Sequence, residues 1–308
     1  MTDTKLILLE GMPSTGKTTN SQFLQIQLEL NGSKAKWIHE IATPHPTALY
    51  NEIGFSLNDQ YKKLALEKWT RFTEKVLSSE SEIYILDSAF FQYQIFWFLL
   101  NNAPYADLER FISEIFDIIK PLNPCLIYLY RKDTEATIDY LEKERGTKDL
   151  ENGWERDKSQ PYYRNKSKGA EGRKQFLRDY ASLAGLLFDH SLCKKKSIEI
   201  SKGNFAYYEK EMLSFLEIER MSCLEIMPEN GVYRNEEFGF EIKVEGTVIT
   251  DPYGNIRKFI PKQGNEFYAE RLPVILRFEK PGEIIISGMQ ICERWTTIGI
   301  VYKKQIKN

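Results

Sequence analysis

Residues 11–18 read Gly-Met-Pro-Ser-Thr-Gly-Lys-Thr, which is a complete G-x-x-x-x-G-K-[ST] pattern. The preceding residues 6–9 are Leu-Ile-Leu-Leu, an apolar run suited to a buried strand. Glycines at the two fixed positions let the backbone turn tightly, so that successive N–H groups can face phosphates, and a helix that starts there adds its positive end. The pattern predicts a nucleotide-phosphate site made of Gly11, Met12, Pro13, Ser14, Thr15, Gly16, Lys17, Thr18 and Thr19.

Three side chains near this loop are suited to phosphoryl chemistry. Lys17 should reach the β- and γ-phosphates, and the hydroxyl of Thr18 should bind Mg²⁺, so we expect ATP and Mg²⁺ as cofactors. Asp87 ends the apolar run 83–86. Its carboxylate could hold Mg²⁺ through a bound water or take a proton from an acceptor hydroxyl, and the alternative is a simple helix N-cap.

A second carboxylate and a group of cations complete the candidate set. Glu40 follows the apolar run 35–39 and is either a general base or a solvated residue at a strand end. Residues 145–173 are dense in cations and aromatic rings. We predict that they form a lid that brings a guanidinium to the transferring phosphoryl group, with a solvated charged connection as the alternative. The candidates are Arg145 first, then Arg156 and Arg164.

Apolar runs of strand length alternate with amphipathic segments of helix length up to about residue 222. The expected strands are 5–10, 35–39, 82–86, 125–130 and 197–200, and the expected helices are 18–30, 58–78, 106–119, 135–144, 172–188 and 204–221. This alternation predicts an α/β fold with a five-stranded parallel sheet flanked by helices. Its ligand should lie at the carboxyl ends of the strands, where the phosphate loop is.

The pattern changes after about residue 222. Short runs rich in Val, Ile, Tyr and Phe, separated by Gly, Pro and Asn, predict an antiparallel β-barrel or sandwich. These runs are 239–244, 247–250, 274–278, 283–287 and 297–302. We therefore predict two domains, residues 1–222 and 223–308. The second shows no catalytic constellation, and packing, formation of a homodimer and ligand sensing remain open as its role.

The composition, 42% hydrophobic and 28% charged, is ordinary for a soluble protein. The net charge of −2 implies no surface for a nucleic-acid polymer. The four cysteines include no C-x-x-C pair, so neither a zinc site nor a disulfide framework is predicted. The first residues lack a signal-peptide pattern, and the most apolar stretch, 83–100, contains Asp87 and Gln92. We expect a cytoplasmic protein without a membrane partner.

Two classes of phosphate-loop protein are disfavoured by what the sequence lacks. GTP-binding switches read guanine with Asn-Lys-x-Asp, whereas residues 165–168 are Asn-Lys-Ser-Lys. Many ATP-hydrolysing motors place an acidic residue directly after the strand-end aspartate, whereas Asp87 is followed by Ser88. Neither a GTPase switch nor a hydrolysing motor is therefore expected.

Residues 8–11 (Leu-Leu-Glu-Gly) and 16–19 (Gly-Lys-Thr-Thr) resemble the Glu-Gly-x-x-x-x-Gly-Lys-[ST] opening of the thymidylate kinase and deoxynucleoside kinase group. Residues 37–40, with two prolines nearby, are similar to the strand end of these kinases that faces the phosphoryl acceptor. Residues 125–146 are similar to their fourth strand, the helix after it and the arginine that opens the lid. The resemblance covers about residues 5–202.

This resemblance implies that the residues after Asp87 line an acceptor pocket, with Phe91 and Gln92 nearest to it. A helix buried against the sheet would explain most of the aromatic residues there without a ligand. Ser88 stands where these kinases carry an arginine for a substrate phosphate or sugar, so the acceptor stays open.

The sequence thus predicts an ATP- and Mg²⁺-dependent kinase that moves the γ-phosphoryl group to a small molecule, with a nucleoside or nucleotide as the leading acceptor. Lys17 would hold phosphates, Thr18 and Asp87 would organise Mg²⁺, and Glu40 or Asp87 would deprotonate the acceptor. The alternative is a nucleotide-gated binding or regulatory ATPase whose all-β part recruits a partner.

Overall fold

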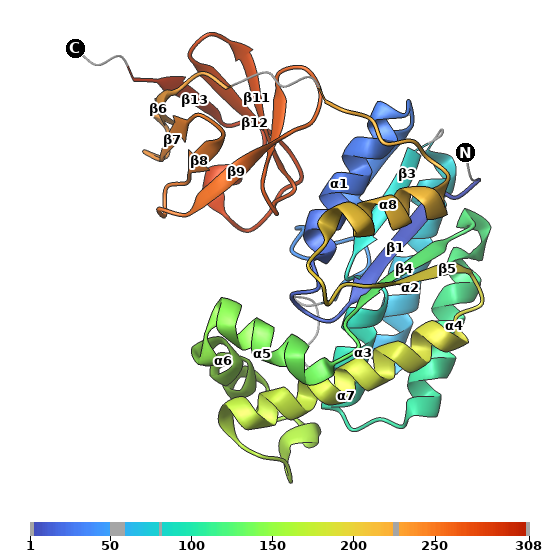
Figure 1. Ribbon diagram of the computed structural model, residues 1–308. Coiled ribbons are helices and arrows are strands. Elements are labelled where there is room, and N and C mark those ends of the chain that lie inside the picture. The colour runs from blue at the N-terminus through green and yellow to red at the C-terminus, as the bar shows by residue number, and fades with distance from the viewer. Residues whose placement is uncertain (1–2, 50–58, 80–81, 224–227, 306–308) are drawn as a thin grey trace.

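The computed structural model describes residues 3–49, 59–79, 82–223 and 228–305. Its first part is a five-stranded parallel sheet of order β2-β3-β1-β4-β5 covered by helices, and its second part is a closed eight-stranded antiparallel barrel (Figure 1). The strands of the sheet are β1 (Leu6–Gly11), β2 (Lys34–Ile38), β3 (Glu82–Asp87), β4 (Cys125–Tyr130) and β5 (Lys194–Glu199). The predicted α/β fold with a parallel sheet is confirmed.

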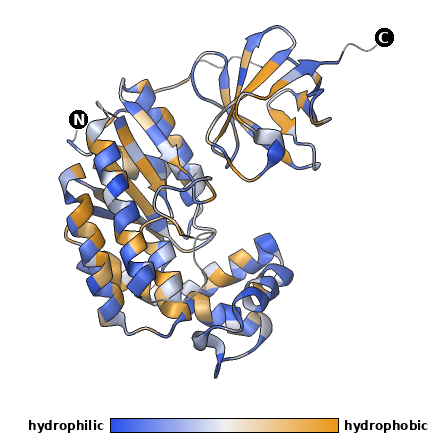
Figure 2. Ribbon diagram, turned by 180° about the vertical axis from the view of Figure 1, so that it is seen from behind, coloured by the Kyte–Doolittle hydropathy of each residue, from blue (hydrophilic) through white to orange (hydrophobic). Residues whose placement is uncertain are grey.

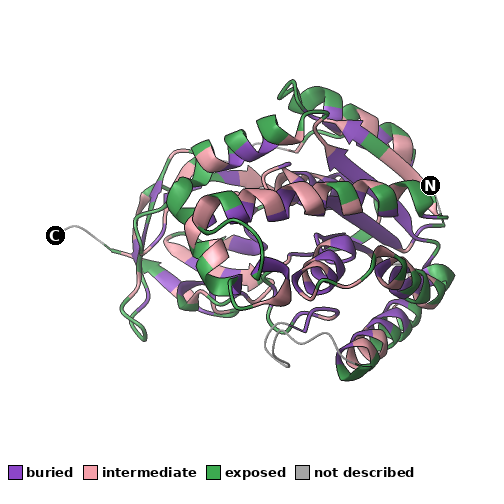
Figure 3. Cartoon of the chain, turned by 90° about the horizontal axis from the view of Figure 1, so that it is seen from below, coloured by how far each residue is buried: buried purple, intermediate pink, exposed green. Residues whose placement is uncertain are grey.

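The central strand β1 is buried on both faces. Leu6 and Leu8 point into one core, whereas Ile7 and Leu9 point into the other. Because side chains alternate along a strand, a continuous apolar run is what a strand covered on both faces requires. Figure 3 shows buried residues, in purple, along the central strands of the sheet. Since β3 runs parallel to β1 with Leu9 opposite Asp87, the phosphate loop and Asp87 lie at the same edge of the sheet.

Eight helices cover the sheet or extend from it within the described residues. They are α1 (Lys17–Leu30), α2 (Asp59–Ser78), α3 (Phe91–Leu100), α4 (Tyr105–Ile119), α5 (Thr134–Arg145), α6 (Thr147–Asp157), α7 (Gly169–His190) and α8 (Phe205–Leu216). The six expected helices are present with shifted ends, and the first residue of the one expected at 58–78 lies outside the described ranges. None of the helices in those ranges combines the length and apolar character needed to cross a bilayer.

Three elements of the α/β part differ from the list of expected elements. Helix α3 was considered only as an explanation for the aromatic residues after Asp87. Helix α6 was not expected, because its sequence is polar and only Leu150 and Asp157 are buried, which leaves no apolar stripe to detect. Strand β5 begins at Lys194 instead of residue 197. It is one of the two edge strands of the sheet, where lysines are tolerated and break the apolar signal.

The all-β part is a closed barrel, so the barrel is confirmed of the two predicted architectures. Its strands are β6 (Gly231–Arg234), β7 (Glu241–Glu245), β8 (Val248–Thr250), β9 (Ile256–Pro261), β10 (Glu266–Ala269), β11 (Val274–Lys280), β12 (Glu283–Gly288) and β13 (Val301–Lys304). They close in the order β10-β11-β12-β13-β6-β7-β8-β9, so no edge stays unpaired. Strands β6, β9 and β10 were not expected. The predicted domain boundary near residue 222 adjoins residues 224–227, which lie outside the described ranges.

The barrel packs against α1 and the edge strand β2. The ring of Tyr268 lies 6.1 Å from that of Trp37, and Ile275 belongs to the same core as α1 and α8. Lys262 of the barrel also pairs with Glu29 of α1 at 3.1 Å. The barrel and the largely hydrophilic α5–α6 pair therefore flank the carboxyl edge of the sheet from opposite sides (Figure 2).

Candidate functional site

The phosphate loop runs from the end of β1 to the start of α1. The ammonium of Lys17 donates to the carbonyls of Gly11 at 2.9 Å and Met12 at 2.8 Å, and the hydroxyl of Thr15 donates to the carbonyl of Met12 at 2.8 Å. These bonds fold the lysine over the loop. Because α1 begins at Lys17, its first N–H groups open toward the same space, which suits an anion.

Both fixed glycines of the loop are required by geometry. At Gly11, with φ of 151°, an added Cβ would lie 2.3 Å from the carbonyl oxygen of Leu129. No side chain fits there, because β1 and β4 approach too closely. Gly16 has φ of 82°, which only glycine adopts without strain. The local sequence therefore dictates the shape of the loop.

Charged side chains converge on Lys17. Burial lowers the pKa of Lys17, the carboxylates of Glu40, Asp87 and Glu10 oppose that shift, and the guanidinium of Arg145 adds to it. An electrostatic effect of this kind requires proximity in a poorly solvated place. The structure therefore brings the four predicted catalytic residues, Lys17, Asp87, Glu40 and Arg145, to one end of the sheet.

Asp87 is the last residue of β3 and is fully buried. Burial raises its pKa, whereas His39, Lys17 and the hydroxyl of Thr18 favour its charged form. One carboxylate oxygen accepts from the hydroxyl of Ser88 at 2.9 Å, and the other has no hydrogen-bond partner among the described residues. Mg²⁺ usually takes one or two protein oxygens and completes its shell with water and phosphate, so this free oxygen beside Thr18 fits the metal.

Glu40 faces the cavity from the end of β2. Its carboxylate accepts from the side-chain amide of Gln92 at 2.7 Å, and its backbone carbonyl accepts from the hydroxyl of Tyr93 at 2.8 Å. Helix α3 therefore fixes the orientation of the carboxylate. Phe91, by contrast, is fully buried against Phe90 with ring centroids 5.1 Å apart and does not line the cavity.

Glu10 is a buried carboxylate that sequence reasoning did not single out as a site residue. One oxygen accepts from the backbone N–H groups of Phe90 at 2.7 Å and Phe91 at 3.0 Å, so Glu10 caps the start of α3 from β1. The other oxygen has no partner among the described residues. Burial raises the pKa of Glu10 to about 7. The signal in the sequence was a lone charge at the end of an apolar strand.

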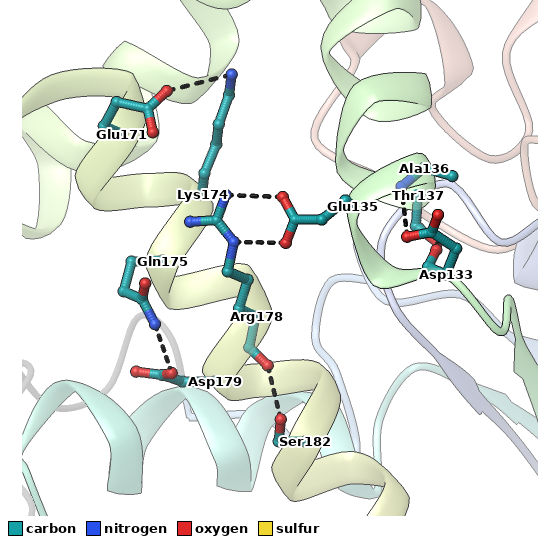
Figure 4. Close-up of polar contacts among 10 residues, drawn as sticks. All are labelled: Asp133, Glu135, Ala136, Thr137, Glu171, Lys174, Gln175, Arg178, Asp179 and Ser182. Carbon is teal, nitrogen blue, oxygen red and sulfur yellow. Dashed lines mark hydrogen bonds and ion pairs between the residues drawn. The ribbon is translucent and has the colours of Figure 1, made fainter.

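Helix α5 carries Arg145 to the cavity and is anchored at its other end. Asp133 caps its start by accepting from the N–H of Ala136 at 3.1 Å. Arg178 of α7 forms a two-pronged pair with Glu135 at 2.6 and 2.8 Å, as Figure 4 shows. The helix is thus tied to α7 near its N-terminus, and its last residue, Arg145, lines the cavity.

The segment expected to be a lid is mostly helical. It contains α6, a short turn of helix at Pro161–Tyr163 and the start of α7. Arg156 forms two bonds with the fully buried carboxylate of Asp157, at 2.8 and 2.7 Å, and Arg173 joins it at 3.1 Å. Arg156 and Arg173 line the cavity, whereas Arg164 does not. Arg173 was missed because it lies within a helical pattern that gave no sign of facing a ligand.

Lys17, Glu40, Arg145, Arg156 and Arg173 line one cavity of about 1040 Å³. Its floor is the loop, residues 13–19, and one wall is α3 with Tyr93, Phe96 and Trp97. The opposite wall is the segment 200–203 with Phe205 and Tyr208 of α8, and Arg271 of the barrel completes the lining. Ligand pockets commonly measure ~300–1,000 Å³, so two small ligands have room here.

No protein-family model matches the sequence, and no curated protein matches it at a significant level. Distant matches exist among solved structures. Thymidylate kinase from Candida albicans matches with a TM-score of 0.43 and 13% identity, over 70% of this chain and 91% of its own. The YorR protein from Bacillus subtilis, solved with phosphorylated GDP, matches with a TM-score of 0.38 and 15% identity, over 69% and 95%. Chaetomium thermophilum Kti12, solved with ADP-AlF3, matches with a TM-score of 0.38 and 14% identity, over 70% and 100%.

The topology itself defines the fold class. A parallel sheet of order β2-β3-β1-β4-β5 with a phosphate loop after β1 is a P-loop kinase-like fold, and an eight-stranded antiparallel barrel is joined to it.

Proposed function

We propose that this chain is a phosphotransferase that uses ATP and Mg²⁺ to phosphorylate a small molecule, with nucleosides and nucleotides as the leading acceptors. The observation that carries the proposal is the convergence of Lys17, Glu40 and Arg145 on one cavity large enough for two ligands. Phosphoryl transfer needs a phosphate cradle, a metal, a base and mobile cations, and each has a candidate here.

The nucleotide would occupy the floor of the cavity. Lys17 would exchange its bonds to the carbonyls of Gly11 and Met12 for bonds to β- and γ-phosphate oxygens. Thr18 and Asp87 would hold Mg²⁺, which neutralises phosphate charge when bound. Phe205 and Tyr208 on the α8 side offer aromatic surface for the base of the nucleotide.

We assign the general base to Glu40 rather than Asp87. Glu40 lines the cavity and its carboxylate is oriented by Gln92, whereas Asp87 does not line the cavity and would act on Mg²⁺ through a bound water. A base must come within hydrogen-bond reach of the proton that it takes. Glu40 would accept the proton of the acceptor hydroxyl as that oxygen bonds to the γ-phosphorus and the bond to ADP breaks. Arg145 would stabilise the charge on the phosphoryl oxygens.

The acceptor would lie against α3. Tyr93, Phe96 and Trp97 give that wall flat apolar surface suited to a ring. Arg173 and Arg156 extend it with positive charge, although both are paired with Asp157. A ring beside cations favours a nucleoside or its monophosphate over a purely apolar molecule.

Calorimetry with ATP and Mg²⁺, followed by a transfer assay on a panel of nucleosides and nucleotides, tests the proposal. Lys17→Ala should weaken ATP binding by about 10- to 100-fold, because it removes a charged hydrogen bond. Glu40→Gln should keep ATP affinity and lower turnover by about 100-fold or more. An unchanged phosphorylated product from Lys17→Ala would refute the assignment. Tight ATP binding without transfer to any acceptor would favour the nucleotide-gated binding protein instead.

A further inference from the structure

The turn between β10 and β11 brings a barrel residue to the cavity. Leu272 donates its N–H to the carbonyl of Ala269 at 3.0 Å, so residues 269–272 form a closed four-residue turn. Arg271, its third residue, has φ of 62°, whereas Glu270 is not among the residues with positive φ. That combination is a type II turn, whose third position normally requires glycine or asparagine. The backbone of an arginine at this position is strained.

The strain is concentrated around the cavity. Among the described residues, six other than glycine have a left-handed φ, and three of these six, Ser14, Ser88 and Arg271, line the cavity. The other three have ordinary explanations. Two are asparagines, which tolerate this conformation, and Glu217 is the residue that ends α8. Strained residues persist where the surroundings hold them in place, and they gather at ligand sites.

A single side chain of α1 holds this turn. The amide nitrogen of Gln22 donates to the carbonyls of Ala269 and Leu272, each at 3.2 Å, and the N–H of Arg271 points at its amide oxygen over a longer 3.4 Å. Gln22 is only 2% exposed. It lies one turn after Thr18 on the helix that starts at the loop. The backbone of Arg271 is therefore fixed relative to the phosphate loop.

The guanidinium of Arg271 is available to a ligand. No hydrogen bond or ion pair joins it to another side chain within the described ranges, and the residue is exposed on the cavity side. Two other arginines of the lining, Arg156 and Arg173, are both engaged by Asp157. A guanidinium presents a planar fork of donors that matches phosphoryl oxygens. An exposed arginine held on a strained, clamped turn is suited to that role.

We propose that Arg271 is a phosphate-binding residue that the barrel supplies to the nucleotide cavity. This inference rests on the proposed function, because it requires a phosphorylated ligand in the cavity. Its consequence is that the barrel forms part of the site, and that ligand binding and the packing of the barrel on α1 reinforce each other. The phosphate belongs either to ATP or to a phosphorylated acceptor, and both present the same oxygens.

Arg271→Gly is the central variant, because glycine adopts the observed φ without strain. We expect it to keep or raise the melting temperature, since the strain is removed. We expect it to lower the affinity for the phosphorylated ligand by about 10-fold or more, since a charged hydrogen bond is lost.

Arg271→Gln keeps the length and the backbone strain, and it should lose similar affinity. Arg271→Lys should retain more affinity than either. Arg234→Ala, an exposed change on β6 outside the cavity, is the matched control and should bind as the wild type does.

Calorimetry on the full chain would compare three probes: ATP with Mg²⁺, nucleoside monophosphates, and the unphosphorylated nucleosides. A loss confined to ATP identifies the phosphates of the nucleotide as the partner of Arg271, and a loss confined to monophosphates identifies those of the acceptor. Nucleoside binding should not change. If Arg271→Gly and Arg271→Gln bind every phosphorylated probe as the wild type does while Lys17→Ala loses ATP, the inference is wrong and the proposed function stands. If the wild type binds no phosphorylated probe, both fail.

Discussion

Asp251, a buried carboxylate of the barrel, differs from Asp87 and Glu10 of the α/β part. In the barrel, Asp251 is 3% exposed and both of its oxygens are bonded. One accepts from the N–H groups of Tyr253 and Asn255 at 2.9 Å each, and the other accepts from the side-chain amide of Asn255 at 2.9 Å. In the α/β part, Asp87 and Glu10 are fully buried, and each has an oxygen without a partner among the described residues.

We infer from the difference that Asp251 builds the fold, whereas Asp87 serves the metal role proposed for it. Buried polar atoms are nearly always bonded, because an unpaired one costs free energy. The hydrogen bonds of Asp251 offset the cost of burying its carboxylate and close the connection between β8 and β9. No group among the described residues bonds the second oxygen of Asp87. A metal bound to that oxygen would explain why the carboxylate is buried.

The largest effect that we expect is that Asp87→Asn loses activity but not stability, whereas Asp251→Asn loses stability but not activity. Asp87→Asn should lower turnover by about 100-fold or more by removing a metal ligand, and it should not lower the free energy of unfolding, because it removes a buried charge. Asp251→Asn should cost about 1–2 kcal/mol of stability, since at least one turn bond is lost, and leave turnover within about 2-fold. Transfer assays over a range of Mg²⁺ and urea unfolding of both variants measure the two effects.

Similar behaviour of the two variants would contradict the roles inferred for Asp87 and Asp251. A large loss of stability in Asp87→Asn with normal turnover in the molecules that remain folded would make Asp87 a structural residue. A loss of turnover in Asp251→Asn at full stability would place chemistry in the barrel turn, where we expect none.

The next effect concerns pH. Burial raises the pKa of Glu10 from 4.5 to about 7, so folding favours its protonated form. Its contribution to stability is fully present below pH 4.5 and is lost as the pH rises through about 7. Glu10→Gln keeps an oxygen that can accept from Phe90 and Phe91 but cannot ionise. Relative to the wild type, this variant should gain about 2 kcal/mol between about pH 5.5 and about pH 8.

Urea unfolding of the wild type and Glu10→Gln at both pH values measures this difference, and titrating groups that do not interact with Glu10 cancel in the comparison. Asp251→Asn serves as the control, because it also replaces a buried carboxylate with an amide. An equal difference between Glu10→Gln and the wild type at both pH values would contradict the raised pKa.

The two parts also differ in how much of each could be predicted from sequence. The phosphate loop, the five strands and the positions of Glu40, Asp87 and Arg145 follow from local patterns, since a buried parallel strand and a glycine turn are encoded by adjacent residues. In the barrel, β6 and β10 were missed because each has only four residues, and β9 was missed because Arg257 and Lys258 interrupt its apolar residues. Short alternating strands leave a weak signal.

The site residues that were missed depend on tertiary contacts. Arg271 comes to the cavity through Gln22, and the Ala269 carbonyl that Gln22 binds lies 247 residues away along the chain. Arg173 faces the cavity because α7 packs against α6 and shares the carboxylate of Asp157. No local sequence pattern predicts either contact. Phe91 shows the converse, because its position after the strand suggested a ligand contact and the side chain enters the core.

The smallest effect that we expect tests whether the barrel acts on the cavity through one contact. Gln22→Ala should cost about 1 kcal/mol of stability and weaken binding of the phosphorylated ligand about 3-fold, because the turn that carries Arg271 is no longer held. The matched control is Gln27→Ala, on the same helix, whose amide bonds the backbone of Met221 instead of the barrel turn.

A double-mutant cycle separates positioning from structure. If Gln22 acts through Arg271, the effect of Gln22→Ala on affinity should vanish in the Arg271→Gly background, while its effect on the free energy of unfolding persists in both. Calorimetry and urea unfolding on the four proteins of the cycle supply both numbers. If Gln22→Ala weakens binding equally with and without Arg271, Gln22 supports the loop through α1 alone. The barrel would then contribute packing and no chemistry, because the turn that carries Arg271 is the only route from barrel to ligand that we propose.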